Sequence, residues 1–307
     1  MVTARYNRRK LMEKRKIGIS DFGFKTQLGW EKSLELIKKS GFDTVDFNLE
    51  SYMLSDEVYG GSEDAFVSHF TAIKEKAADL ELEIAQTHGR CSTYAPNNES
   101  HNKWVKDISE KDLRATAILG APSCVIHSIN CSAWGKIDPE VLHAESKKMY
   151  DDLIPFAEKN KVNISLETFG AAILRGSRIC DLFSYPSEIT RQYESMDTEY
   201  KTICLDSGHT HEVGSFWVPP VEDMIRALGN KISLTHLHDN MGVRDDHLLP
   251  GMGNINWPAV FDAFEEVGYK GTYNFELRTA FWGSMMEDGI EFMGKYLRRF
   301  VDGHGKI

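Results

Sequence analysis

Eight short runs rich in β-branched and aromatic residues recur along the chain, and they constrain the fold more than any other feature. Their starts lie roughly 30–40 residues apart, the length of one strand, one helix and two loops. Stretches with apolar residues at helical spacing separate the runs, as in the segment from Val260 to Gly268. The predicted strands are Lys16–Ser20, Thr44–Asn48, Glu83–His88, Ser123–Ile129, Val162–Thr168, Thr202–Asp206, Ser233–His238 and Tyr273–Leu277.

Strands that alternate with helices form a parallel sheet, and eight such units are the number that closes a (β/α)8 TIM barrel. A length of 307 residues would also allow two domains, but barrels of this kind routinely exceed about 250 residues. No Pro/Gly/Ser-rich linker interrupts the chain. We therefore expect an α/β fold with one (β/α)8 barrel over residues 16–307, preceded by a basic extension over residues 1–15.

A doubly wound open sheet is the alternative fold. Such sheets bind dinucleotides at a Gly-rich turn after the first strand. Here the first predicted strand continues as Ser20-Asp21-Phe22-Gly23-Phe24, which lacks that turn. The sequence therefore disfavours a nicotinamide or flavin enzyme.

Charge is distributed unevenly along the chain. Residues 1–16 hold seven Lys or Arg and one Glu, whereas residues 17–307 carry a net charge of −16. A body this acidic repels a phosphate backbone, which argues against general nucleic-acid binding. We interpret the basic start as a solvated tail, because no apolar stretch typical of a secretion signal follows it.

The remaining composition points to a protein of the cytoplasm. The longest apolar runs have five or six residues, far below the ~18 needed to cross a bilayer, so no membrane span is expected. The five cysteines include no C-x-x-C pair, which disfavours a disulfide scaffold or a Cys-rich zinc module. Cys124 and Cys204 lie in apolar runs and are expected in the core.

Titratable side chains occur at the ends of six consecutive predicted strands. Because barrel active sites lie at the carboxyl ends of the strands, these groups should meet at one rim. Burying several carboxylates together is unfavourable without a cation, so their convergence predicts a metal ion. The six groups are His88, His127, Glu167, Asp206, His238 and Glu276.

The ligand types narrow the choice of metal. Two Glu, one Asp and one His suit a labile divalent ion such as Mn²⁺, Co²⁺, Mg²⁺ or Zn²⁺ with open positions for substrate. His236 shares a strand face with His238, and we expect His238 to be the ligand because it lies nearer the strand end. His69, His101, His143 and His304 are expected at the surface. Further polar groups follow in the loops, at His209, His211, Asp239, Asn240, Asp245, Asp246 and His247.

At these residues the chain resembles the sugar phosphate isomerase/epimerase superfamily. These are xylose isomerase-like TIM barrels, which include ketose 3-epimerases and endonuclease IV. The resemblance covers about residues 16–300 and is more specific in the second half. The segments that carry it are Leu34–Asp46, Ile164–Glu167, Leu205–His209, His236–Asn240, His247–Trp257 and Gly271–Glu276.

The resemblance implies a metal-dependent sugar isomerase or epimerase that works through an enediolate. It maps one divalent metal, Mn²⁺ by preference, onto Glu167, Asp206, His238 and Glu276, with Glu167 and Glu276 doubling as acid and base. It also suggests a homo-oligomer, either a dimer or a tetramer. The residues expected to contact a small sugar substrate are His88, His127, His209, His247, Trp134 and Arg278.

Three alternatives remain open at this point. An enzyme that cleaves C-linked glycosides would use the same metal-assisted enolisation. An abasic-site nuclease similar to endonuclease IV would hold three zinc ions, for which this chain also has ligand types, but the acidic barrel argues against DNA binding. A binding module without catalysis would not need the metal set. The counterparts of the three-zinc set are His88, His127, Glu167, Asp206, His209, His238, Asp245, His247 and Glu276.

Overall fold

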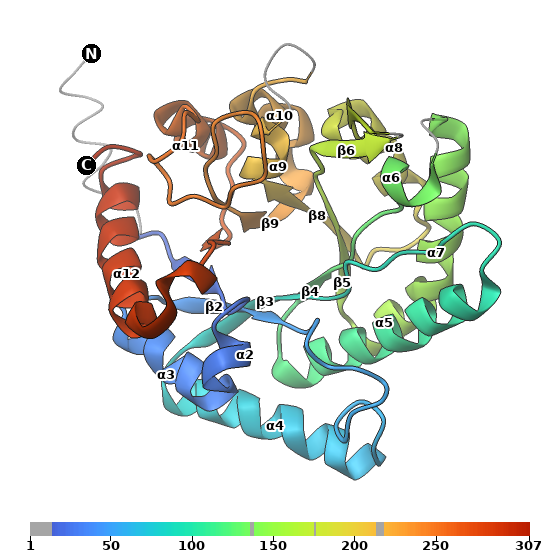
Figure 1. Ribbon diagram of the computed structural model, residues 1–307, viewed down its shortest axis with the longest axis horizontal. Coiled ribbons are helices and arrows are strands. Elements are labelled where there is room, and N and C mark those ends of the chain that lie inside the picture. The colour runs from blue at the N-terminus through green and yellow to red at the C-terminus, as the bar shows by residue number, and fades with distance from the viewer. Residues whose placement is uncertain (1–13, 136–137, 175, 213–217) are drawn as a thin grey trace.

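Eight parallel strands form a nearly closed barrel at the centre of the computed structural model, with helices around it (Figure 1). The structure describes residues 14–135, 138–174, 176–212 and 218–307. Residues 1–13, most of the predicted basic extension, lie outside these ranges. The barrel strands are β1 (Ile17–Ser20), β2 (Thr44–Asn48), β3 (Glu83–His88), β4 (Ser123–Val125), β5 (Asn163–Glu167), β8 (Lys201–Asp206), β9 (Ile232–His236) and β10 (Tyr273–Phe275).

The order of the strands around the barrel follows the chain, β10-β1-β2-β3-β4-β5-β8-β9. Closure between β9 and β10 occurs just past the end of β9, where Leu237 bridges to Phe275. There the N–H of Leu237 donates to the carbonyl of Asn274 at 2.8 Å. The prediction of a single (β/α)8 barrel is therefore confirmed.

Local sequence signals explain where the helices begin and end. The Ser62 hydroxyl accepts a hydrogen bond from the N–H of Ala65 at 3.2 Å and caps α4, and Gly120 ends α5 with a φ of 83°. Asp138 caps α7, with Pro139 at the first helical position. The helices are α2 (Lys25–Leu28), α3 (Trp30–Lys39), α4 (Glu63–Asp79), α5 (Glu99–Leu119), α6 (Cys131–Trp134), α7 (Pro139–Asn160), α8 (Pro186–Ser195), α9 (Ser207–His211), α10 (Val221–Leu228), α11 (Trp257–Glu266) and α12 (Met286–Asp302), with 3-10 turns η1 (Leu182–Ser184), η2 (Gly229–Lys231) and η3 (Ala280–Met285).

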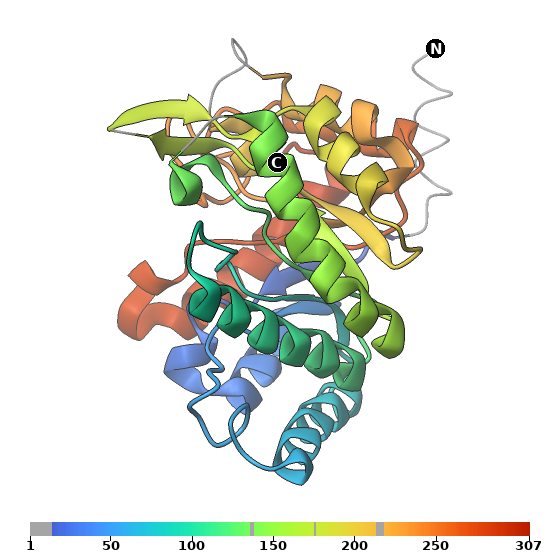
Figure 2. The ribbon, with the colours of Figure 1, turned by 90° about the vertical axis from the view of Figure 1, so that its right-hand side faces the viewer.

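A β-hairpin that the sequence did not predict follows β5. Strands β6 (Ala171–Leu174) and β7 (Ser177–Cys180) pair antiparallel as a separate two-stranded sheet. Figure 2 shows this hairpin, in yellow-green, reaching out from the body of the molecule. Neither strand is among the eight runs predicted from the sequence, and each has only four residues.

The apolar core lies mainly between the barrel and the helices. It includes Phe47, Leu166 and Ile203 from the strands, all with no solvent exposure. The inside of the barrel is more polar, since Asp46 and Asn274 are also fully buried. Cys124 and Cys204 are buried, as predicted.

Four strands end earlier than the sequence indicated, β5 by one residue at Glu167. Strand β4 ends at Val125, β9 at His236 and β10 at Phe275, so His127, His238 and Glu276 follow the strands rather than belong to them. The expectation that His143 lies at the surface was wrong: it is buried between α7 and α8, where its ring contacts Gln192 and Glu188 at 2.9 and 2.8 Å. Within the described ranges, no helix is both long and apolar enough to span a membrane.

Candidate metal centre

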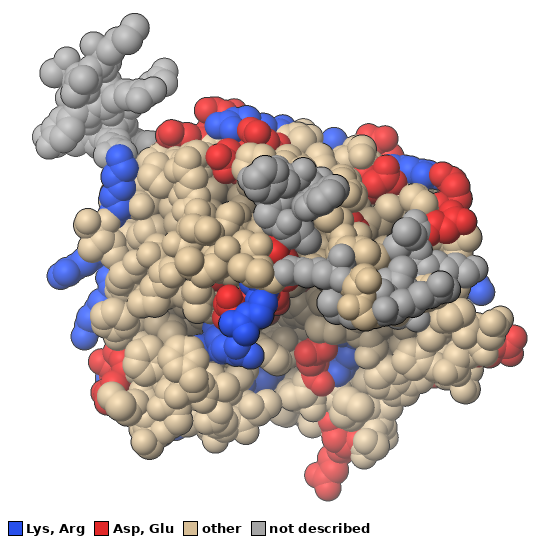
Figure 3. Space-filling view, turned by 45° about the horizontal axis from the view of Figure 1, so that its top comes forward, with Lys and Arg blue, Asp and Glu red and all other residues tan. Residues whose placement is uncertain are grey.

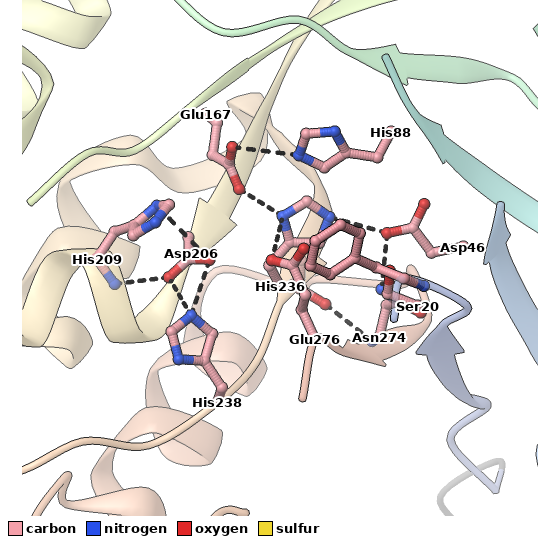
Figure 4. A network of polar contacts seen from close by, with 12 residues as sticks. Ser20, Asp46, His88, Glu167, Asp206, His209, His236, His238, Asn274 and Glu276 are labelled. Atoms are coloured by element: carbon pink, nitrogen blue, oxygen red, sulfur yellow. Dashed lines mark hydrogen bonds and ion pairs between the residues drawn. The ribbon is translucent and has the colours of Figure 1, made fainter. Parts of the chain in front are cut away.

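Five buried side chains meet at the carboxyl ends of the barrel strands (Figure 4). Strand register explains the layer, because Asp206 and His236 are direct partners at the ends of β8 and β9. Four of the five side chains bring one donor atom each within 4.8 Å of one another, and all four are buried. These four are Glu167, Asp206, His236 and Glu276; the fifth is His88.

Glu167 is the carboxylate with the most histidine contacts in this layer. Its Oε1 contacts Nδ1 of His236, and its Oε2 lies 2.8 Å from Nε2 of His127 and 3.9 Å from Nε2 of His88. Glu276 reaches the same point from just past β10, with its Oε2 3.6 Å from Nδ1 of His236. Glu167 and Glu276 therefore approach one imidazole nitrogen from two different strands.

Asp206 organises the neighbouring part of the site. Its Oδ1 accepts a hydrogen bond from the N–H of His209 at 2.6 Å, which caps α9. The same carboxylate lies 3.0 Å from Nε2 of His238. A Cβ on Gly208 would overlap the His238 ring, so this position requires glycine.

The two histidines at the end of β9 and just past it differ in position. His236, at the strand end, belongs to the four-residue group, whereas His238 lies two residues further along and groups with His247 and Glu276. The His238 and His247 rings stack with centroids 4.0 Å apart and planes at 10°. The sequence predicts His238 as the ligand; in the structure the four-residue group contains His236, at the last residue of its strand, and His238 stands in a different group.

The loop between β9 and α11 carries a second group of polar side chains. Nε2 of His247 lies 2.9 Å from Oδ2 of Asp245, and Nε2 of His209 lies 3.5 Å from the same oxygen. Asp239 fixes this loop, since its carboxylate accepts hydrogen bonds from the N–H groups of Gly251 and Ile255 at 2.8 and 3.2 Å.

Charge coupling shifts the pKa values of the central groups. Burial disfavours the ionised form of Glu167, but the charges and hydrogen bonds of His236 and His127 hold its pKa well below the usual range. Burial also disfavours the imidazolium of His236, yet the carboxylates of Glu276 and Glu167 raise its pKa well above the usual value. Protonated histidine thus balances the buried carboxylates.

The same pattern holds around Asp245. Burial disfavours the ionised form of Asp245, but the positive charge of His209 lowers the pKa of this carboxyl group. For His247, burial lowers the pKa, while the hydrogen bond to Asp245 and the charge of Glu276 together raise it to about 9. Around Glu167 and around Asp245, a metal cation could replace the protons of the histidines, because metal ligands bind in their deprotonated forms.

The residues present fit a divalent metal ion. The donors of the four-residue group are three carboxylates and one imidazole, a mixture suited to Mn²⁺, Co²⁺, Mg²⁺ or Zn²⁺. Three buried carboxylates this close together are unfavourable unless positive charge compensates them. Further groups that could hold an ion include His88–Glu167–His236 and His209–Asp245–His247.

The side chains of two of the predicted substrate contacts make no contact with this cluster among those of the described residues. Trp134 packs against the core, and its indole N–H donates to the carbonyl of Tyr94 at 2.8 Å. Arg278 is exposed, and its backbone N–H donates to the carbonyl of His247 at 3.0 Å. The other four predicted substrate contacts, His88, His127, His209 and His247, all belong to the cluster.

Sequence reasoning missed two side chains that shape the site. Asp46 contacts Nε2 of His236 at 3.0 Å, and its polar position in β2 was visible in the alternation Thr44, Asp46, Asn48. Phe169 lies between two histidines, with ring centroids 4.9 Å from His127 and 5.5 Å from His209. Nothing in the sequence distinguished Phe169 from ordinary core packing.

Comparison with known proteins supports the barrel assignment. A family model described as a xylose isomerase-like TIM barrel matches residues 34–296. An uncharacterised protein of Sinorhizobium fredii is 26% identical over 265 residues, 81% of each chain. An inosose isomerase of Bacillus velezensis is 24% identical over 259 residues, covering 80% of this chain and 82% of the relative.

Solved structures share the fold at low sequence identity. A D-tagatose 3-epimerase-like protein superposes with a TM-score of 0.68 at 21% identity, covering 93% of this chain and 99% of the other. The IolI protein, in a structure with a bound zinc atom, superposes with a TM-score of 0.71 at 16% identity, covering 94% and 97%. With the family match over residues 34–296, the barrel shows that this chain belongs to the xylose isomerase-like TIM barrel family.

Proposed function

We propose that this protein is a divalent-metal-dependent isomerase or epimerase acting on a sugar or sugar derivative. The observation that carries the proposal is the convergence of Glu167 and Glu276 on the buried donor group that also contains Asp206 and His236. The names of the relatives agree, since an inosose isomerase and a D-tagatose 3-epimerase-like protein are among them.

Glu167 and Glu276 are assigned as the acid and base of the reaction. They come from β5 and from just past β10, which are separated in the barrel by β8 and β9, so they reach the substrate region from different directions. One carboxylate removes a proton from the carbon next to the substrate carbonyl, and the other returns a proton. Return to the opposite face of that carbon gives an epimer, and return to the neighbouring carbon gives an isomer.

Glu167, Asp206, His236 and Glu276 are the residues that would hold the metal. When bound, the ion would polarise the substrate carbonyl and hydroxyl and so acidify the adjacent C–H bond. We assign His236 rather than His238 because its Nδ1 faces both Glu167 and Glu276. His236→Gln should therefore weaken metal binding more than His238→Gln, as measured by calorimetric titration.

The histidines around the centre are assigned to substrate hydroxyls. His88, His127, His209 and His247 surround the donor group and present ring nitrogens that can donate or accept hydrogen bonds. Phe169, between His127 and His209, offers an apolar surface for the C–H face of a sugar. Trp134 and Arg278 remain candidates for the outer part of the site.

Charge favours a small substrate over a nucleic acid. On the face seen in Figure 3, the basic side chains stand in small groups beside acidic ones and form no continuous band. With a net charge of −16 over residues 17–307, the barrel lacks the electrostatic attraction that DNA binding needs. We therefore retain the sugar enzyme over an abasic-site nuclease.

A substrate screen tests the proposal. Metal-stripped protein, reloaded with Mn²⁺, Co²⁺, Mg²⁺ or Zn²⁺, is incubated with ketoses and inososes, and the products are identified by NMR. The proposal predicts conversion of at least one of these substrates and no incision of a duplex that contains an abasic site. Incision of that duplex without sugar conversion would contradict it.

A further inference from the structure

A carboxylate inside the barrel contacts the back of the His236 ring. Asp46, on β2, is fully buried, and its Oδ2 lies 3.0 Å from Nε2 of His236. The same oxygen accepts hydrogen bonds from the side-chain amides of Gln86 at 3.2 Å and Asn274 at 3.3 Å. Figure 4 shows Asp46, His236 and Glu167 in a row, with the imidazole between the two carboxylates.

This arrangement indicates which nitrogen of His236 would keep its proton when a metal binds. Since Gln86 and Asn274 both direct amide N–H groups at Oδ2, that oxygen acts as an acceptor. The amide of Gln86 also reaches the carbonyl of Thr235 at 3.5 Å, which supports its orientation with the NH₂ inward. Nε2 of His236 must therefore be the donor toward Asp46. Nδ1 faces the carboxylates of Glu167 and Glu276, and it is the nitrogen whose proton a metal ion would replace.

The other oxygen of Asp46 supports a role beyond packing. Its Oδ1 is buried and has no hydrogen-bond partner among the described residues. Burying a carboxylate with one oxygen unpaired is unfavourable, and an apolar residue could fill this space without that penalty. Among the hydrogen-bond contacts of the described residues, that of Oδ2 with His236 is the one by which this side chain reaches the donor group.

We propose that Asp46 is a positioning residue, which holds His236 with Nε2 protonated and Nδ1 directed at the metal. The proposal rests on the proposed function, because it takes His236 as a metal ligand. Carboxylates behind metal-binding histidines fix the ring and increase its basicity, and losing them typically lowers metal affinity by about 10–100-fold.

Metal affinity provides the first test. Asp46→Asn keeps the size of the side chain and an acceptor oxygen but removes the charge. Calorimetric titration of metal-stripped protein with Zn²⁺ should show binding about 10–100-fold weaker than in the wild type. The matched control is Asp43→Asn. Asp43 directly precedes the same strand and pairs with Arg298 and the N–H of Ile17, away from His236, so its variant should bind Zn²⁺ like the wild type.

The tautomer of His236 provides a second test, which does not depend on any variant at Asp46 folding. In ¹⁵N-histidine spectra of the Zn²⁺-loaded wild type, the signal missing from His236→Gln should show Nε2 protonated and Nδ1 bound. A spectrum with Nε2 unprotonated, or wild-type Zn²⁺ affinity in Asp46→Asn, would overturn the proposal.

The two proposals can fail separately. A wild type that binds Zn²⁺ and shows the expected tautomer but converts no sugar would contradict the proposed function and support the role of Asp46. A wild type that binds no divalent metal would overturn both.

Discussion

Nδ1 of His236 contacts the carboxylate of Glu167 across the barrel, although the two residues are 69 positions apart in the chain. The contact joins the ends of β9 and β5, and Glu276 approaches the same nitrogen from just past β10. Three strand ends thus converge on one point, where charge, hydrogen bonding and burial all act on the same few atoms.

Replacing Glu276 with Gln should remove one of the two groups that transfer protons. Because general acid–base catalysis contributes about 10²–10⁴-fold, kcat on the sugar substrate should fall by a factor in that range. The matched control is Glu83→Gln, which changes an exposed carboxylate at the start of β3, at the opposite end of the barrel. Steady-state kinetics of both variants should show a loss in the first and none in the second; unchanged turnover in Glu276→Gln would exclude its assigned role.

Removing the metal should abolish activity and lower stability. A ligand that binds only the folded state adds about 2.7 kcal/mol to the free energy of unfolding when its concentration is 100 times its Kd. Urea denaturation of chelator-treated protein, with and without added Mn²⁺, measures this difference. Equal stability and equal activity in the two samples would show that the buried carboxylates serve another purpose.

The loop that carries Asp245 and His247 should depend on Asp239. This carboxylate accepts hydrogen bonds from Gly251, Ile255 and the indole of Trp257, the last at 2.8 Å. Asp239→Ala leaves these donors without their acceptor, so the free energy of unfolding should fall by about 3–5 kcal/mol.

Asp246→Ala is the control for that experiment, since Asp246 lies in the same loop and pairs only with the exposed Arg244 among the described residues. Its loss should change stability by less than about 1 kcal/mol in urea denaturation. If both variants are equally stable, Asp239 does not anchor the loop.

The pH dependence of the metal-free protein should reveal the His247 contact with Asp245. The pKa of His247 is raised from 6.5 to about 9 in the folded state. The folded protein therefore holds this proton more tightly than the unfolded chain, so the stabilisation is complete below pH 6.5 and is lost as pH rises to about 9. The difference in unfolding free energy between wild type and His247→Gln should shrink across that window by at most about 3 kcal/mol. A constant difference would contradict the shift.

The barrel was predictable because eight strands repeat a simple local signal. Each buried strand is a short β-branched run, as in Asn163–Glu167, and the helices between them have clear apolar faces and end at residues such as Gly120. The hairpin of β6 and β7 was missed because its two strands of four residues pair only with each other. Strands this short, inside a long connection, cannot be told from a loop by their sequence when they do not belong to the alternation of strands and helices.

The site was predictable in composition but not in detail. The convergence of Glu167, Asp206 and Glu276 was predictable because carboxyl strand ends meet at one rim of a barrel. The choice between His236 and His238 depends on where β9 ends, and a sequence pattern does not resolve a difference of two residues. His143 was misplaced because its partners, Gln192 and Glu188, are 49 and 45 residues away in the chain.

Exchange of a substrate hydrogen with solvent tests the central claim most directly. The metal-loaded protein is incubated in D₂O with the ketose or inosose that it converts, and NMR follows the C–H next to the carbonyl. If Glu167 and Glu276 transfer protons at that carbon, deuterium should enter the product there, and Glu276→Gln should abolish this incorporation. The wild type could instead convert the substrate while the product keeps all of its original hydrogen at that carbon. That result would contradict proton transfer by carboxylates that exchange their protons with solvent.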